Sequence, residues 1–281
     1  MPGIRIVDTM PPISIEAERV FELLGFPISN SIIASWLTML ILIVVSLRVS
    51  RNMKLAPAAR SFQNIVEAVL EMFYNGVAKI RAGDQVNLFF PLSATIFFFV
   101  LISNWLGALI PGFGSIGLLE HHHGEEVFVP LLRSTCSDLN TTLALALFAV
   151  ISIQIYGVKV QGFFRYAGRF IRVGGFVNFF KSLVGSRPRK GMLKTLMNAV
   201  IDAFIGVLEI FDELTKLLSF SFRLFGNIFA GEVLLIVIAL LVPVIAPLPF
   251  QGLELFVGYI QALIFATLTL VFLKMATTHH G

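Results

Sequence analysis

The sequence predicts an all-α integral membrane protein with five spanning helices, an amphipathic helix at the inner face and a final hairpin of two long tilted helices. Its 281 residues are 57% hydrophobic and 14% charged, and the mean hydropathy is +0.87. This composition is too apolar for a water-soluble domain. Five regions are long enough to cross a hydrocarbon core of roughly 30 Å, which takes about 20 apolar residues. Because no repeat or linker divides the chain, residues 1–281 are expected to form a single membrane domain.

Three spans of ordinary length come first, at residues 31–47, 88–110 and 141–158. Each is followed by a polar or Pro/Gly-containing loop, where spanning helices usually end. Residues 1–30 mix acidic with apolar side chains, whereas a signal peptide has a basic start followed by an uninterrupted apolar run. We therefore expect them to form an outer N-terminal segment of the mature chain.

Between the first two spans, apolar side chains recur at helical spacing among polar ones. The apolar positions are Phe62, Ile65, Val66, Val69, Leu70 and Phe73, and the polar ones are Gln63, Glu67 and Glu71. A helix with one apolar and one charged face lies in the membrane interface rather than across the bilayer. This pattern predicts the amphipathic helix at the inner surface.

The fourth region, residues 196–245, is too long to cross the membrane upright. Its roughly 50 residues at about 1.5 Å each would make a helix about 75 Å long. The helix must be strongly tilted, broken, or preceded by an interfacial stretch. Its first half should face protein or water because it carries charges that lipid does not tolerate; these are Asp202, Glu209, Asp212, Glu213 and Lys216. Three prolines then end it, and residues 253–272 form the fifth region and complete the hairpin.

The charges of the loops predict the orientation, since cytoplasmic loops collect Lys and Arg. The loop after the first span carries Arg48, Arg51, Lys54 and Arg60, and the loop after the second carries Glu120, Glu125, Glu126 and Asp138 against one Arg133. Residues 159–195 hold nine basic residues and no carboxylate. We expect this basic loop inside, the N-terminus outside and the C-terminus in the cytoplasm. Anionic lipid is its expected contact, and nothing indicates nucleic acid.

Arg223 is the strongest candidate for a functional residue because it lies deep inside a hydrophobic stretch. A guanidinium stays protonated, and insertion of an arginine at the centre of a span costs about 2.5–3.5 kcal/mol. The structural alternative is an arginine that snorkels from a helix end, but Arg223 lies far from both ends of its region. An arginine kept at this cost favours function.

A polar stripe leads inward from Arg223. Asp202, Glu209 and Lys216 precede it at intervals of seven residues and so share one helical face, and Asn227 follows one turn later. The stripe predicts a polar path toward the inner surface.

Carboxylates lie on the other side of Arg223, toward the outer surface. Glu232 is nine residues beyond Arg223 and therefore on the opposite face of the helix. On the last helix Glu254 lies near the outer end, and Gln261 lies deeper on the same face, near the level of Arg223. Buried hydrogen-bonded carboxyls and a helix-packing amide would explain these three residues equally well. With the inner stripe, however, they match two offset half-channels separated by a cation.

The twelve residues from 221 to 232, Ser-Phe-Arg-Leu-Phe-Gly-Asn-Ile-Phe-Ala-Gly-Glu, closely resemble the signature of subunit a of rotary F-type ATP synthases. Further matches are residues 137–142 (Ser-Asp-Leu-Asn-Thr-Thr), Asn104-Trp105 with Pro111-Gly112, and residues 261–265 (Gln-Ala-Leu-Ile-Phe). The resemblance covers most of the chain. It is similar enough to imply a fold, a site and partners.

The resemblance implies an ion-translocating stator for H⁺ or Na⁺, with Arg223 facing the carboxylates of a rotating c-ring. Glu232, Glu254 and Gln261 fall on the family's channel positions, and Glu209 falls on its inner-access position. Many relatives carry His or Gly at one of the paired sites, so two glutamates leave open which one hands over the ion. The implied partners are the c-ring, peripheral-stalk b subunits and other ATP synthase subunits, in a bacterial plasma membrane.

Two other classes of protein, a secondary transporter and an enzyme, fit the sequence less well. A secondary transporter could bind an anionic substrate at Arg223, but such proteins are built from repeats. No nucleotide-binding Gly-Lys-Ser/Thr loop is present in the sequence, so the chain is not expected to be an enzyme by itself. No cofactor or metal is expected either: Cys136 is the single cysteine, and the run His121–His123 reads as a solvated outer loop.

Overall fold

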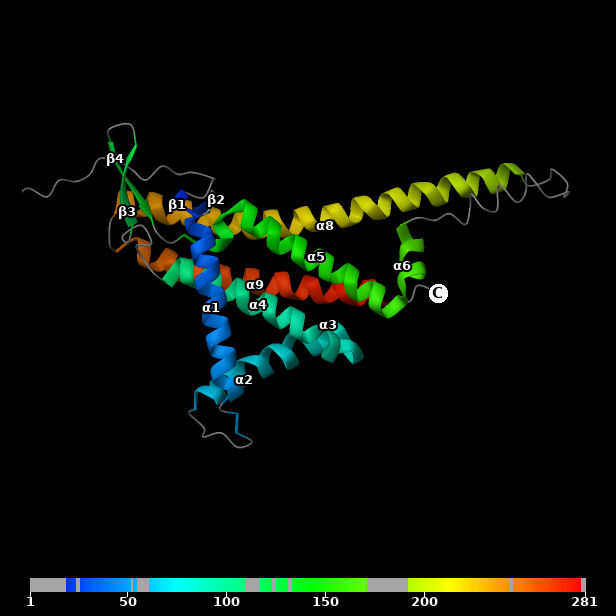
Figure 1. The fold of residues 1–281 in the computed structure, drawn as a ribbon, viewed down its shortest axis with the longest axis horizontal. Helices are drawn as coiled ribbons and strands as arrows, with labels where there is room; N and C mark the ends of the chain where they lie inside the picture. The colour runs from blue at the N-terminus through cyan, green and yellow to red at the C-terminus, as the bar shows by residue number, and fades with distance from the viewer. Residues whose placement is uncertain are drawn as a thin grey trace, which may run out of the picture.

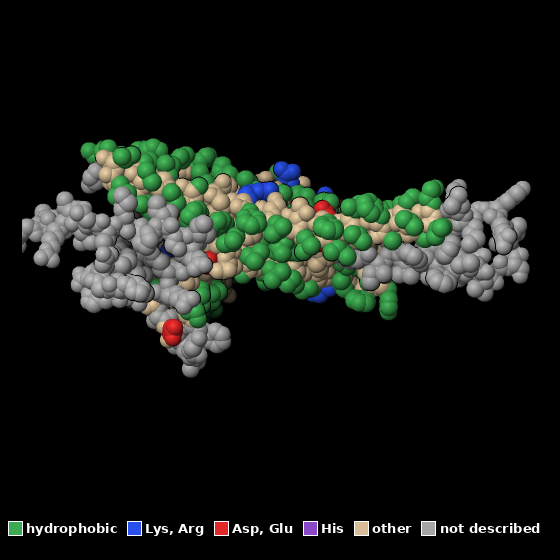
Figure 2. Space-filling view, turned by 90° about the horizontal axis from the view of Figure 1, so that it is seen from above, with side chains coloured by type: hydrophobic (Ala, Val, Ile, Leu, Met, Phe, Trp, Pro, Cys, Tyr) green, Lys and Arg blue, Asp and Glu red, His purple; other side chains and the backbone are tan. Residues whose placement is uncertain are grey.

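The computed structural model describes residues 19–23, 26–51, 53–54, 61–109, 117–122, 125–130, 133–170, 192–242 and 245–278. Within these residues, five helical stretches are long and apolar enough to cross a membrane; they are Asn30–Arg51, Phe62–Leu109, Leu139–Gln161, Leu196–Leu241 and Pro247–Thr277. Among the coloured side chains in Figure 2, hydrophobic ones are the most abundant, and Lys, Arg, Asp and Glu appear only in small groups. The predicted all-α integral membrane fold is confirmed.

Four long helices run side by side, and a fifth, which is the first long helix of the chain, crosses them (Figure 1). The four are α4 (Val86–Leu109), α5 (Leu139–Gln161), α8 (Met192–Leu241) and α9 (Pro247–Thr277), and α1 (Asn30–Arg51) is the crossing helix. Helix α9 packs against α4, α5 and α8. The core between them is rich in phenylalanine and small residues, including Phe97, Phe220, Phe265, Ala262 and Ala266.

The amphipathic segment and the second span form one continuous helical stretch. Helix α2 (Phe62–Phe73) begins where the Ser61 side chain accepts a hydrogen bond from the Asn64 backbone N–H, as helix N-caps do. It continues through a π-helical turn (η1, Tyr74–Ala78), α3 (Lys79–Ala82) and a 3₁₀ turn (η2, Gly83–Gln85) into α4. Gly83 has a φ of 62°, a conformation that favours glycine, and α4 runs back from there toward α1 (Figure 1).

Helix α8 runs from Met192 to Leu241 without interruption. Of the three possibilities for the over-long region, a break within it is therefore wrong. The helix also ends four residues before the expected limit of 245. Helix α9 starts earlier than the expected 253, at Pro247, because a proline in the first helical turn needs no N–H partner and already has a helical φ.

Two short antiparallel hairpins were not expected. They are β1 (Arg19–Leu23) with β2 (Phe26–Ser29), and β3 (Gly117–His122) with β4 (Glu125–Pro130). Residues 1–18, His123 and most of the basic loop, residues 171–191, lie outside the described residues. Helix α6 (Phe163–Phe170) belongs to the start of that loop.

The segment 133–138, which includes the 3₁₀ turn η3 (Thr135–Ser137), lies buried among the helices before α5. Asp138 is the N-cap of α5 and accepts a hydrogen bond from the Asn140 backbone N–H over 3.0 Å. Its other oxygen accepts hydrogen bonds from Thr141 Oγ1 and from Ser31 Oγ on α1, each over 2.9 Å. One carboxylate therefore begins α5 and also joins it to α1.

Candidate functional site

The pairing of α8 with α9 fixes which residues of the two helices lie at the same level. Phe220 stacks on Phe265, with ring centroids 4.7 Å apart. Further along α8, a Cβ added at Gly231 would lie 3.4 Å from Glu254 Oε1. The step between these contacts is 11 residues on both helices. Two antiparallel helices with the same rise per residue advance by equal numbers of residues between contacts, so these two contacts define one register.

By this register Arg223 lies opposite Ala262 and so at the level of Gln261. Gln261 is buried. Arg223 is exposed and donates from Nη2 to Ser219 Oγ over 3.1 Å, and Asn227 is exposed one turn later. The cation and the amide thus lie on an outer side of α8, where another chain can reach them.

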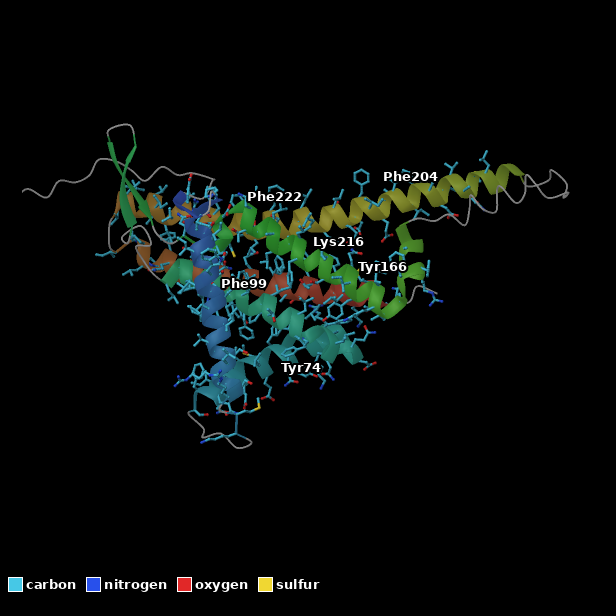
Figure 3. The ribbon with its side chains drawn as sticks, in the orientation of Figure 1. Tyr74, Phe99, Tyr166, Phe204, Lys216 and Phe222 are labelled. Atoms are coloured by element: carbon cyan, nitrogen blue, oxygen red, sulfur yellow. The ribbon has the colours of Figure 1, made fainter. Side chains whose placement is uncertain are left out.

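Side chains on α8 separate into a packed side and an outer side. Figure 3 shows Phe222 pointing away from α5 and α9, and Lys216 on the side that faces them. The Lys216 Nζ lies 5.1 Å from the centroid of the Phe272 ring of α9. Arg223 lies seven residues after Lys216 and so near the same face of the helix, but at its level the side chain is exposed. The predicted polar stripe is therefore packed against α9 at Lys216 and open at Arg223.

Glu232 is bound by Arg133, which the sequence indicates only as a charge in the loop after the second span. Arg133 Nε lies 3.2 Å from Glu232 Oε1 and 3.1 Å from Oε2. The Arg133 side chain is only 10% exposed, and its guanidinium carbon lies 5.8 Å from the centroid of the Phe229 ring. The only hint in the sequence was that Arg133 is a lone cation in an acidic loop.

Glu254 has a different environment. Its Oε2 is buried, and no described residue gives it a hydrogen bond. The carboxyl lines a cavity of about 50 Å³ together with Asn227 and six mainly apolar neighbours, Gly231, Leu234, Leu235, Phe250, Leu253 and Val257. The cavity therefore reaches from Glu254 to the amide one turn from Arg223. A space of this size exceeds the volume that one water molecule needs.

Acidic residues gather on α8 at the other side of Arg223. Oxygen atoms of Glu209, Asp212 and Glu213 all lie within 4.8 Å of one another. Lys216 Nζ binds Asp212 over 2.8 Å and Glu213 over 2.9 Å. Asp202 is half-buried nearer the start of α8.

The arrangement places carboxylates on both sides of a fixed positive charge. Glu254 and Glu232 lie on the side of Arg223 where α8 ends and α9 begins. Glu209 and its acidic neighbours lie on the other side, toward the start of α8. Arg223 lies between the two groups along α8. A permanent cation at that point repels another cation.

Residues 32–274 match the family described as ATP synthase A chain. The matched range covers α1 through most of α9 and includes every candidate site residue.

Proposed function

Because the chain belongs to the ATP synthase A chain family, we propose that it supplies two offset half-channels that carry H⁺ or Na⁺ to and from the carboxylates of a rotating c-ring. Family membership makes it a multi-pass, ion-translocating membrane subunit of ATP synthase that works with other subunits of that complex. The observation that carries the proposal is Arg223, exposed on α8 between two groups of carboxylates.

The outer half-channel leads past Glu254 and Glu232 to Asn227. The cavity that joins Glu254 to Asn227 supports this path. An ion that arrives there neutralises a ring carboxylate, and the neutral site can then turn into the lipid because it no longer carries a charge.

Arg223 makes the transfer directional. A fixed cation favours the ionised form of a neighbouring carboxyl group, so a loaded ring site that approaches Arg223 gives up its ion. The ion leaves through the inner half-channel at Glu209 and Asp202, and the acidic neighbours of Glu209 support that exit. Arg223 also prevents direct flow between the half-channels. Such a leak would waste about 2.3 kcal/mol for each elementary charge that crosses a membrane potential of 100 mV.

The exposed side of α8 is the surface that faces the ring. Near Arg223 it carries Ser219, Gly226 and Ala230, and small residues allow close approach of a partner helix in a membrane. On α9, Gln261 lies at the level of Arg223, and an amide at that level is consistent with the same proposed ion path.

The remaining assignments follow from the family and the loop charges. The b subunits of the peripheral stalk are the other proposed partners, and nucleotide chemistry belongs to other subunits of the complex. The N-terminus lies outside and the C-terminus in the cytoplasm of a bacterial plasma membrane. The family assignment favours this function over a secondary transporter that binds an anion at Arg223.

The test is passive ion conductance of the membrane sector in proteoliposomes, comparing wild type with Arg223→Ala, with and without a blocker of the ring carboxylates. We expect a wild-type conductance that the blocker abolishes, and an uncoupled leak in Arg223→Ala. Arg165→Ala is the matched control, because Arg165 is an exposed arginine on α6 away from the site. Equal fluxes in wild type and Arg223→Ala would reject the proposal.

A further inference from the structure

The two outer carboxylates differ in their partners. Both Glu232 oxygens lie within hydrogen-bonding distance of Arg133 Nε, at 3.2 and 3.1 Å. No described residue donates to Glu254 Oε2, although that atom is buried. The family position of each carboxylate does not say which one carries the ion, but their surroundings do.

Arg133 is held firmly in place by the segment to which it belongs. A Cβ added at Gly107 on α4 would lie 2.6 Å from the Ser134 Cβ, so the backbone after Arg133 touches α4 closely. At the other end of the segment, Asp138 is bound to α1 and to the start of α5. A guanidinium on such a segment is preorganised, and it loses little freedom when it binds Glu232.

Charge counting separates the two glutamates. Arg133 pairs with the half-buried Glu232, so an ionised Glu254 beside this pair would carry its negative charge on a carboxyl whose Oε2 is buried without a hydrogen bond from a described residue. Burial of an unpaired charge is costly. The arrangement with the least charge is an ion pair between Arg133 and Glu232 and a carboxyl at Glu254 that is neutral when it holds a proton.

We infer that Arg133 is a positioning residue of the outer half-channel: it holds Glu232 as a fixed anion and leaves Glu254 as the carboxyl that loads and releases the proton. The inference rests on the proposed function and deepens it. The cavity supports the assignment, because it is lined by Glu254 and Asn227 and otherwise mainly by apolar side chains. So few oxygen ligands suit a proton better than a metal cation.

The proton step balances without any other reactant. An O–H bond of Glu254 breaks, the proton crosses the cavity, and a new O–H bond forms on the ring carboxylate. Glu254 remains as a carboxylate and takes its next proton from water on the outer side. The Arg133–Glu232 ion pair keeps the same charge throughout, so it provides a constant field at the step.

The test uses ATP-driven proton uptake by inverted membrane vesicles that contain the whole complex. Glu254→Gln should slow the initial rate by about a hundredfold, since it removes the group that transfers the proton. Arg133→Gln should slow it by about tenfold, because it leaves Glu232 as a half-buried anion without its partner. The double variant Arg133→Gln/Glu232→Gln should recover most of that loss, since replacing both members of an ion pair removes the unpaired charge as well.

One further variant and one further measurement separate positioning from a merely structural role. Arg133→Lys keeps the charge and should retain more activity than Arg133→Gln. In Arg133→Gln the dependence of the rate on the pH of the vesicle lumen, which is the outer side of the membrane, should also change, because Glu254 then lies near an unpaired negative charge. The change should disappear in the double variant, which removes that charge. A loss of structure would lower the rate at every pH. The amount of complex in the membrane, measured by immunoblotting of its subunits rather than by any activity, corrects for assembly.

Proton uptake by the double variant as slow as that of Glu254→Gln would overturn the inference, because Glu232 itself would then be required. A rate for Arg133→Gln equal to wild type would overturn it as well. Failure of the proposed function is a separate result, seen when Arg223→Ala vesicles take up protons like wild type. In that case the inference is rejected together with the proposed function. If Arg223→Ala vesicles are inactive, the proposed function stands, and the rates of the Arg133 variants alone test the inference.

Discussion

Asn104 of α4 donates a hydrogen bond from its side-chain amide to the backbone carbonyl of Gly258 on α9, over 3.2 Å. The two helices approach closely at this point because Gly258 has no side chain. A Cβ added there would lie 2.9 Å from the Asn104 Cβ. Next to it, Trp105 Nε1 donates to the carbonyl of Leu255 over 3.1 Å. These contacts hold the helix that carries Glu254 against α4.

The first prediction concerns this approach. Gly258→Ala should destabilise the protein by about 1–3 kcal/mol, because the added methyl group overpacks the α4–α9 contact. Gly252→Ala is the matched control: it lies on the same helix, and a Cβ there meets nothing within 4 Å. Thermal unfolding in detergent measures both variants. A Gly258→Ala protein as stable as Gly252→Ala would contradict the prediction.

The second prediction concerns the start of α5. Asp138→Ala removes the helix cap and leaves Ser31 Oγ without its acceptor, so unfolding should become easier by about 1–3 kcal/mol. Asp138→Asn should retain most of the stability, since an amide oxygen can still cap the helix. The same thermal unfolding experiment compares them, and equal losses in the two variants would show that the cap is not the cause.

The third prediction concerns the single cysteine. Burial raises the pKa of the Cys136 thiol to about 12, and the thiolate is the form that reacts. Because the raised pKa keeps the thiol protonated at neutral and mildly alkaline pH, maleimide should label Cys136 only after denaturation. A Met53→Cys variant that lacks Cys136 should label at once, since Met53 is exposed. Rapid labelling of native Cys136 at pH 8 would refute the burial.

The fourth prediction concerns the contact between α5 and α6. A Cβ at Gly157 would overlap the Tyr166 ring, and the Tyr166 hydroxyl donates to Gln154. Gly157→Ala should therefore displace α6 and make it more accessible to protease. Gly168→Ala is the control, because a Cβ at Gly168 meets nothing within 4 Å. Limited proteolysis of membranes distinguishes the two, and identical cleavage patterns would be evidence against a tight α5–α6 contact.

The class of the protein and the order of its helices follow from local patterns in the amino-acid sequence. Hydrophobic length and helical spacing are local properties, so the five apolar stretches and the amphipathic helix could be predicted from neighbouring residues. Arg223 stood out for the same reason, since a charge within an apolar stretch is visible without any partner. The end of α8 and the start of α9 were placed less well, because prolines stop one helix but are accepted in the first turn of the next.

Which side chains meet depends on the packing of distant segments. Arg133 and Glu232 are 99 residues apart, and the pairing depends on how the segment 133–138 packs among four helices. The position of Glu254 beside Gly231 depends on the register of α8 with α9. Periodicity gives the face of a residue on its own helix but not its level on a neighbour. The different surroundings of the two glutamates therefore arise from packing between distant segments, which no local pattern contains.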